Sequence, residues 1–178
     1  LDSPDNRIQG FLAAGHVCAI MGYWEYVPIA EQYQIPIVVT GFEPLDLVNG
    51  ILQTVELLEE KRVEVKNAYQ RVVTYQGNQA AQRMINEVFR PVDRNWRGIG
   101  TILQSGFGLE ETYKKFDATL RFDTSSIQTE ESKICIAGQV LQGLKKPSEC
   151  PAFGTLCTPQ SPLGAPMGVV INRDGLGS

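Results

Sequence analysis

The sequence lacks an excess of basic residues. It has 16 lysine and arginine residues against 20 aspartate and glutamate residues, which gives a formal net charge of −4. Binding to a nucleic-acid backbone requires a basic face that neutralises phosphates. The charge balance therefore argues against a nucleic-acid partner.

Long hydrophobic runs are also missing. No apolar stretch approaches the roughly 18 residues that cross a bilayer. The opening LDSPDNR has neither the basic start nor the apolar core of a secretory signal. These absences predict a cytoplasmic protein with no membrane partner. The first residue is leucine rather than methionine, which predicts a processed, cloned or excised start.

Cysteine is present at four positions, but no two cysteines form a CxxC pair. This disfavours a zinc ribbon or a thioredoxin-like redox motif. Cys135, Cys150 and Cys157 lie near the end of the chain, and thiolates are ligands suited to iron–sulfur clusters or zinc. Three sulfurs are one short of the usual four, so spacing alone leaves open both a metal site and unliganded loop cysteines. Cys18 lies in an apolar setting and is predicted to be a packed core thiol.

Apolar periodicity predicts that strands alternate with helices through residues 1–122. We expect strands over 8–13, 35–40 and 63–65, and helices over 17–33 with an interruption at Pro28, over 45–60 and over 79–89. The run IPIVVT is typical of a strand buried on both faces of a parallel sheet. The alternation predicts an α/β fold, a parallel sheet flanked by helices.

The helix over 45–60 carries apolar residues at helical spacing on one face, which predicts that this face packs. They are Leu45, Val48, Ile51, Leu52, Val55 and Leu58. Residues 93–108 are Gly-rich and are interpreted as irregular, with a strand at 99–103. A helix is expected over 110–116.

The remaining chain reads as a polar linker followed by a cysteine-rich segment. The linker is predicted over 123–132. Residues 133–178 combine three cysteines with many prolines and little apolar periodicity, so we expect a small irregular segment organised by a metal.

Three candidate site residues follow predicted strands at the points where helices begin. His16 is the only histidine and follows the first strand, whereas Glu43 and Asp46 belong to the turn GFEPLD after the second. The carboxyl ends of parallel strands form the edge where open α/β folds bind ligands. A backbone hydrogen bond of His16 and helix capping by the two acids are the alternatives that need no function.

Six further polar or aromatic residues are interpreted as surface and packing residues, and a partner surface is the alternative. They are Asn67, Tyr69, Arg71, Arg94, Trp96 and Arg97.

Several strings of the sequence resemble consecutive blocks of the HypD family of hydrogenase maturation proteins. They are FLAAGHVCAIMG, PIVVTGFEPLDLVNGI, NAYQRVV, GNQAAQRMINEVF, RNWRGIG and KKPSECPAFGTLCTPQSPLGA. They occur in the family's order, and GFEPLD and ECPAFGTLCTP are the most specific. The resemblance identifies the chain as similar to the C-terminal half of the family.

The resemblance implies a scaffold rather than a free-standing enzyme. HypD works with HypC and then HypE, and iron acquires two cyanides and one carbon monoxide on this platform for nickel–iron hydrogenases. By this likeness His16, Glu43 and Asp46 line a cleft. Cys135, Cys150 and Cys157 would bind a 4Fe–4S cluster that relays electrons.

The chain departs from the family in two places. The family's N-terminal half, with its own cysteine motifs, is missing. Where the family ends in GACMVSSEGACAAYY, this chain has GAPMGVVINRDGLGS, so that Pro166 replaces a cysteine and a downstream cysteine is missing. Asp174 is a candidate non-cysteine ligand. The alternatives to a maturation scaffold are a nonfunctional remnant or excised folding module of the same family and, with less support, a small thiol oxidoreductase.

Overall fold

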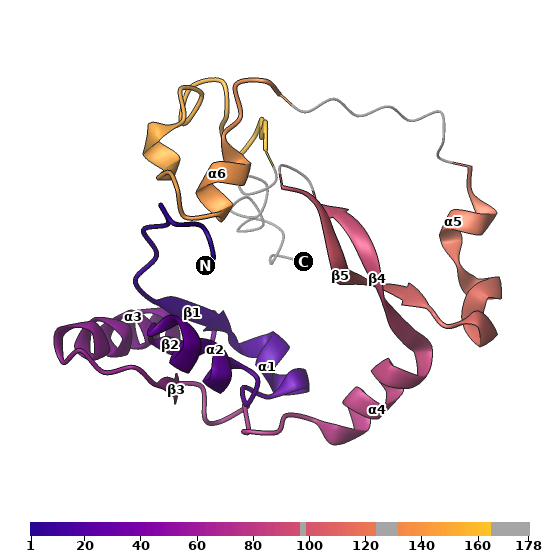
Figure 1. Ribbon diagram of the computed structural model, residues 1–178, viewed down its shortest axis with the longest axis horizontal. Coiled ribbons are helices and arrows are strands. Elements are labelled where there is room, and N and C mark those ends of the chain that lie inside the picture. The colour runs from indigo at the N-terminus through magenta and orange to yellow at the C-terminus, as the bar shows by residue number, and fades with distance from the viewer. Residues whose placement is uncertain (97–98, 124–131, 165–178) are drawn as a thin grey trace. The chain divides into compact units, whose positions relative to one another are not determined.

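The computed structural model describes residues 1–96, 99–123 and 132–164 (Figure 1). The chain divides into two compact units. The first spans Ile8–Glu87, and the second combines Leu1–Arg7 with the chain from Val88 onward. The predicted domain over 1–122 therefore extends across the boundary between the units. None of the helices in the described residues has the length and apolar character needed to cross a membrane.

The unit Ile8–Glu87 is built on a three-stranded parallel sheet with strand order β1-β2-β3. The strands are β1 (Phe11–Ala14), β2 (Ile37–Thr40) and β3 (Val65–Asn67). All four residues of β2 are buried, as expected for a central strand rich in β-branched residues. The predicted α/β fold and the predicted central strand are confirmed, whereas β3 begins two residues later than predicted.

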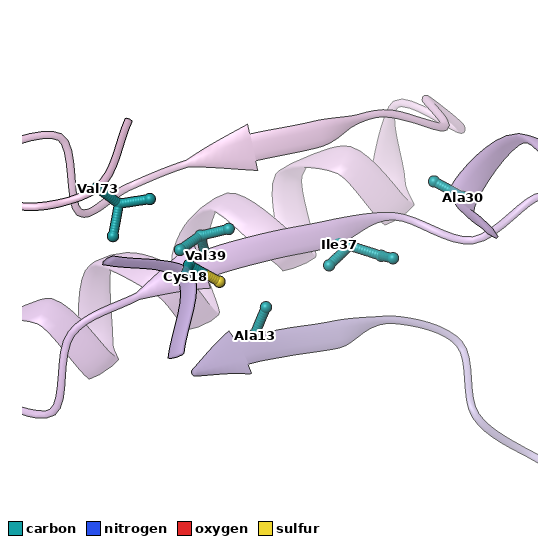
Figure 2. Packing of buried hydrophobic residues seen from close by; sticks show 6 residues of the cluster. All are labelled: Ala13, Cys18, Ala30, Ile37, Val39 and Val73. Atoms are coloured by element: carbon teal, nitrogen blue, oxygen red, sulfur yellow. The ribbon is translucent and has the colours of Figure 1, made fainter. Parts of the chain in front are cut away.

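Helices cover both faces of this sheet. Ile37 and Val39 of β2 pack with Cys18 and Ala30, which belong to α1 (Gly15–Met21) and α2 (Tyr26–Tyr33) (Figure 2). Side chains alternate between the faces of a strand, so Val38 and Thr40 point to the opposite face. That face is covered by α3 (Pro44–Glu59), which contacts β1 and β2.

The boundary between α1 and α2 lies at Gly22, not at Pro28 as predicted. Gly22 has a φ of 78°, a conformation that favours glycine, and ends α1. Pro28 lies in the first turn of α2. A backbone N–H has no partner within the helix there, so proline does not break the helix.

The bounds of α3 agree with the prediction, but the side of the helix that packs on the sheet does not. The buried residues of α3 are Asp46, Gly50 and Leu57. The six apolar residues predicted to pack are all exposed, from 37 % for Leu58 to 80 % for Leu45. The helix packs on β2 through Gly50 because the two elements lie very close there: a Cβ on Gly50 would lie 2.8 Å from Oγ1 of Thr40. This close approach explains why α3 does not pack through its apolar face.

The second unit contains a β-hairpin that was not predicted from the sequence. Strands β4 (Phe89–Trp96) and β5 (Gly100–Leu109) pair antiparallel, with a register irregularity between Val92 and Arg94. Residues 93–108 were interpreted as mostly irregular, which is wrong. The helix α4 (Gln79–Val88) precedes the hairpin and confirms the helix expected there.

Short elements make up the rest of the described chain. They are the 3-10 helix η1 (Glu111–Phe116), α5 (Ala118–Arg121), α6 (Ala137–Leu141) and the 3-10 helix η2 (Pro147–Glu149). The cysteine-rich segment otherwise contains turns and two isolated bridges up to residue 164. Most of the predicted linker over 123–132 lies outside the described residues.

Candidate functional site

The turns after β1 and β2 lie side by side at one edge of the sheet. The two strands are parallel with Ala14 opposite Thr40, so both chains leave the sheet at the same edge. The ring centroids of His16 and Phe42 are 4.7 Å apart. His16 is exposed and Phe42 keeps 59 % of its surface accessible. The predicted adjacency of the two turns is therefore observed, and it presents an imidazole to solvent.

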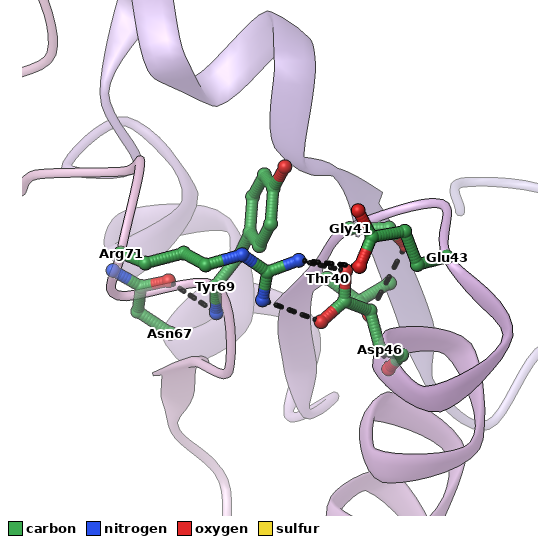
Figure 3. A network of polar contacts seen from close by, with 7 residues as sticks. All are labelled: Thr40, Gly41, Glu43, Asp46, Asn67, Tyr69 and Arg71. Carbon is green, nitrogen blue, oxygen red and sulfur yellow. Dashed lines mark hydrogen bonds and ion pairs between the residues drawn. The ribbon is translucent and has the colours of Figure 1, made fainter.

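Asp46 and Glu43 meet an arginine from the turn that follows β3. Arg71 donates from Nη1 to Oδ1 of Asp46 at 2.7 Å and from Nη2 to Oδ2 at 2.6 Å (Figure 3). Nη2 also donates to Oε2 of Glu43 at 3.1 Å. The Asp46 side chain is only 9 % exposed, whereas Glu43 is 77 % exposed. The arginine therefore fixes Asp46 in place and leaves most of Glu43 open.

The bidentate pair between Asp46 and Arg71 sets the charges of both groups. The hydrogen bonds from Arg71 lower the pKa of Asp46 below its ordinary value. The same hydrogen bonds raise the pKa of Arg71. Paired charge-assisted hydrogen bonds of this kind fix geometry as well as protonation. Asp46 is therefore held ionised and oriented at the first turn of α3.

Tyr69 supports the pair and packs against both turns. The guanidinium carbon of Arg71 lies 4.5 Å from the centroid of the Tyr69 ring. A Cβ on Gly15 would lie 2.6 Å from this ring, and a Cβ on Gly41 would lie 2.7 Å from it. Asn67 orients the segment, because its Oδ1 accepts from the Tyr69 backbone N–H at 2.9 Å. Glycine at both positions thus leaves room for the Tyr69 ring, against which the Arg71 guanidinium lies.

Replacing Gly41 by alanine is expected to weaken the Asp46–Arg71 pair. The new methyl group would collide with the Asp46 carboxylate and the Tyr69 ring. Overpacking of this kind costs about 1–3 kcal/mol of unfolding free energy, which urea denaturation would measure. In an Arg71→Ala background the loss should be smaller, since the pair is already broken. Equal losses in both backgrounds would contradict a coupling between Gly41 and the pair.

The three C-terminal cysteines converge on one pocket of the second unit. Cys135, Cys150 and Cys157 line a cavity of about 420 Å³. The other lining residues are apolar or lack a side-chain ligand; they are Ala137, Val140, Pro147, Phe153, Gly154, Pro159 and Gly164. The structure thus brings together three residues that are 15 and 7 positions apart along the sequence.

Local hydrogen bonds hold two of these sulfurs. The backbone N–H of Leu163 donates to Sγ of Cys157 at 3.3 Å, and Cys157 is buried. The Cys150 thiol donates to the carbonyl oxygen of Ile134 at 3.8 Å. Hydrogen bonds to cluster sulfurs are one of the means by which proteins tune iron–sulfur centres. The segment therefore contains a donor that would stabilise a thiolate at Cys157.

Thiolates are ligands suited to iron–sulfur clusters or zinc. Within the described residues, no three His, Cys, Asp or Glu side chains are arranged to share one metal ion. The three thiols nevertheless line one cavity. A 4Fe–4S cluster distributes its cysteine ligands over different iron atoms, so its sulfurs need not meet at one point.

The cysteine-rich segment is tied to the start of the chain next to Cys150. Arg7 donates from Nη2 to Oε2 of Glu149 at 2.7 Å, and its backbone N–H donates to the Gly143 carbonyl at 2.9 Å. The backbone N–H of Lys146 donates to the same Glu149 oxygen at 2.6 Å. The Lys146 N–H, followed by Arg7, lowers the pKa of Glu149 to about 2.

The ionised Glu149 is expected to make the stability of this segment depend on pH. Its folded pKa is below the unfolded value of about 4.3, so its contribution is present above that value. The contribution is lost as the pH falls toward about 2. Hydrogen exchange of residues 132–164 should therefore accelerate over this window in the wild type. A Glu149→Gln variant should show a weaker dependence; an identical pH profile would contradict this assignment.

Cys18 occupies a different environment from the other three cysteines. It is fully buried in the core of the unit Ile8–Glu87, and its Sγ lies 3.8 Å from the Tyr26 hydroxyl. Burial raises the pKa of the Cys18 thiol and raises that of Tyr26 to about 12. The prediction of a packed core thiol is confirmed.

Residues 1–172 match a family model described as HypD, hydrogenase formation hypA family. The chain belongs to the HypD family. The match covers both the sheet edge and the cysteine pocket, so both features lie within the family's own sequence. The resemblance found in the sequence is confirmed at this level.

HypD proteins from several bacteria are similar to this chain over nearly its full length. Hydrogenase maturation factor HypD of Escherichia coli is 42 % identical over 94 % of the chain, which spans 45 % of that relative. HypD2 of Bradyrhizobium diazoefficiens is 40 % identical and HypD of Cupriavidus necator 39 %, each over 94 % of the chain and 46 % of the relative. The chain spans about half the length of the curated relatives that it matches.

Arg71 is the residue of this HypD chain whose role sequence reasoning missed. It was interpreted as a surface residue with a possible partner role, whereas it forms the bidentate pair with Asp46. A signal was present, because NAYQR begins at the last residue of β3, so Arg71 leaves the sheet at the same edge as the other two turns. Two calls, Pro166 and Asp174, lie outside the described residues.

Proposed function

We propose that this chain forms part of a HypD maturation scaffold on which the Fe(CN)₂CO group of nickel–iron hydrogenases is assembled. The iron with its cyanide and carbon monoxide ligands is the cargo of this scaffold. The partners are HypC-like and HypE-like maturation proteins. The single observation that carries the proposal is the convergence of Cys135, Cys150 and Cys157 on one pocket in a chain of this family.

The cysteine pocket is the proposed electron-transfer centre. Cys135, Cys150 and Cys157 would hold a 4Fe–4S cluster, which when bound relays single electrons. The lining around the three sulfurs is apolar, and the backbone N–H of Leu163 donates to Sγ of Cys157. The surroundings of the sulfurs and hydrogen bonds to them are known means of setting the potential of an iron–sulfur centre.

The sheet edge is the proposed contact with the cargo. His16 and Glu43 are exposed there, so an imidazole and a carboxylate are available to orient a thiolate or an iron-bound ligand. Asp46 has both oxygens bonded to Arg71 and acts as a positioning residue for the turn that carries Glu43. The sheet edge thus combines two exposed polar side chains, His16 and Glu43, with the fixed ion pair between Asp46 and Arg71.

Exposed aromatic surface supports a protein partner for the same unit. Phe42 is 59 % exposed beside His16, and Trp24 is 45 % exposed after α1. Large exposed aromatic side chains are enriched in protein–protein interfaces. The exposure of these two side chains supports docking of another maturation protein.

The proposed function is tested by a chimera. This chain replaces the matching segment of the Escherichia coli HypD relative, and the chimera is expressed in cells that lack their own HypD. Hydrogenase activity should be restored to a measurable fraction of the wild-type level. If a folded, expressed chimera gives no activity, the remnant or excised module becomes the better description.

Cluster binding is tested separately on the chain itself. Anaerobic reconstitution with iron and sulfide should give a stable chromophore with bound iron and acid-labile sulfide. Cys135→Ala, Cys150→Ala and Cys157→Ala should each lower the iron content severely. Wild-type iron content in all three variants would reject the pocket as the cluster site.

A further inference from the structure

The side of α3 that faces away from the sheet carries an apolar stripe with a symmetric order of residues. The stripe consists of Leu45, Val48, Ile51, Leu52, Val55 and Leu58, which are between 37 and 80 % exposed. Successive members are three, three, one, three and three positions apart. Leucine stands at both ends, valine lies next inward from each end, and isoleucine and leucine lie at the centre. The stripe therefore presents nearly the same shapes in the same order from either end of the helix.

This symmetry is what a contact with a second copy of the same helix requires. In a two-fold symmetric dimer one surface faces itself, so that residue i of one copy contacts residue j of the other, and j contacts i. When two copies of α3 lie antiparallel with their midpoints on the two-fold axis, every member of the stripe meets a residue of the same or similar size. The pairs are Leu45 with Leu58, Val48 with Val55, and Ile51 with Leu52.

We propose that the apolar stripe of α3 is the contact surface of a weak, reversible homodimer of this chain, in which two copies of the helix pack antiparallel. Full burial of a valine or leucine side chain removes roughly 100 Å² of apolar surface from water, so the exposed parts of the stripe amount to roughly 300 Å² per copy. Apolar patches of this size on a monomer are often functional. A contact limited to one helix face stays below about 1,200 Å² in total, the range of transient interfaces, so we expect a dissociation constant in the micromolar range or above.

The charges at the ends of α3 favour the antiparallel arrangement over a parallel one. Glu59 follows Val55 by four positions and so continues the stripe at the C-terminal end, where the last turn of the helix has no basic residue. An acid is unfavourable at this negative end of the helix dipole. In the antiparallel dimer Glu59 comes beside Pro44 at the positive end of the other copy, where Arg71 offsets the charge of Glu43. A parallel dimer would bring two acidic helix ends together.

Self-association is tested by analytical ultracentrifugation of the full chain with a reducing agent present, so that no disulfide links the copies. A reversible monomer–dimer equilibrium is expected over micromolar to millimolar concentrations. Leu52→Glu should raise the dissociation constant at least about tenfold, because a carboxylate would be buried against apolar side chains. Met84→Glu is the matched control on α4, where Met84 is 66 % exposed, and should dimerise like the wild type. Circular dichroism checks that each variant is folded.

Two results of this experiment would overturn the proposal. One is a dimer that Leu52→Glu leaves intact, since the contact would then lie elsewhere on the chain. The other is a chain that stays monomeric at the highest concentration. That result is expected if another protein, or another segment of the same chain, covers the stripe instead of a second copy.

The antiparallel pairing is tested with opposite charges at one predicted contact. Val48→Lys and Val55→Glu should each raise the dissociation constant at least about tenfold, since each buries an unpaired charge. An equimolar mixture of the two variants should associate more tightly than either variant alone, because the lysine of one copy then meets the glutamate of the other. Val48→Lys mixed with Val48→Glu is the matched control and should show no gain, because position 48 does not face itself in this arrangement. No gain in the test mixture, or a gain in the control mixture alone, would overturn the antiparallel dimer.

Discussion

Replacing His16 by alanine in the chimera with the Escherichia coli relative is expected to abolish hydrogenase maturation while leaving the fold intact. His16 is exposed at the sheet edge and its ring contacts Phe42. Truncation of an exposed side chain usually changes the free energy of unfolding by no more than about 0.5 kcal/mol. The variant should therefore lose hydrogenase activity, whereas its urea midpoint should stay close to that of the unsubstituted chimera.

Two controls make this result specific to the imidazole. Glu31→Ala removes another exposed side chain of the same unit, on α2, and should mature hydrogenase normally. His16→Asn keeps a neutral hydrogen-bonding group and should retain part of the activity if His16 orients a ligand. Normal maturation by His16→Ala would remove the sheet edge from the proposed function.

Replacing Leu57 by alanine is expected to cause one of the largest losses of stability among single substitutions in this chain. Leu57 is 0 % exposed and lies on the side of α3 that faces the sheet. Removal of a buried leucine side chain costs about 2–5 kcal/mol, because the transfer energy is lost and a cavity remains. Urea unfolding followed by circular dichroism would measure the change.

Leu45 provides the matched comparison on the same helix. It is 80 % exposed, so Leu45→Ala should alter the free energy of unfolding by about 0.5 kcal/mol or less. The sequence pattern alone predicts the opposite order, since Leu45 belongs to the apolar face that was expected to pack. A larger loss at Leu45 than at Leu57 would therefore show that α3 packs through its apolar stripe.

The sequence predicted those parts of the fold in which composition and burial agree. The run 35–40 was placed correctly as a central strand because β2 is buried on both faces and needs β-branched residues. The bounds of α3 followed from Pro44 at its start and the apolar periodicity after it. Its orientation did not follow, because the packing side uses Gly50 and Asp46, which an apolar pattern ignores.

The hairpin and the arginine pair show why the rest of the prediction failed. In β5 the glycines at 100, 106 and 108 interrupt the alternation that signals a strand, and most residues of the strand are exposed. Arg71 and Asp46 are 25 positions apart and meet only because three parallel strands end at one edge. The candidate residues at that edge were identified correctly as neighbours, but their partner required the topology.

Because Cys18 is buried, thiol labelling can report whether the first unit is folded. An alkylating reagent added to the native protein should reach Cys135 and Cys150, which are partly exposed, while Cys18 stays unmodified inside the first unit. Unfolding that unit would release one further reactive thiol. Mass spectrometry of the labelled peptides could therefore measure two properties in one sample. Labelling of Cys18 would report unfolding of the first unit, and labelling of Cys135 and Cys150 would report whether the cysteine pocket is occupied.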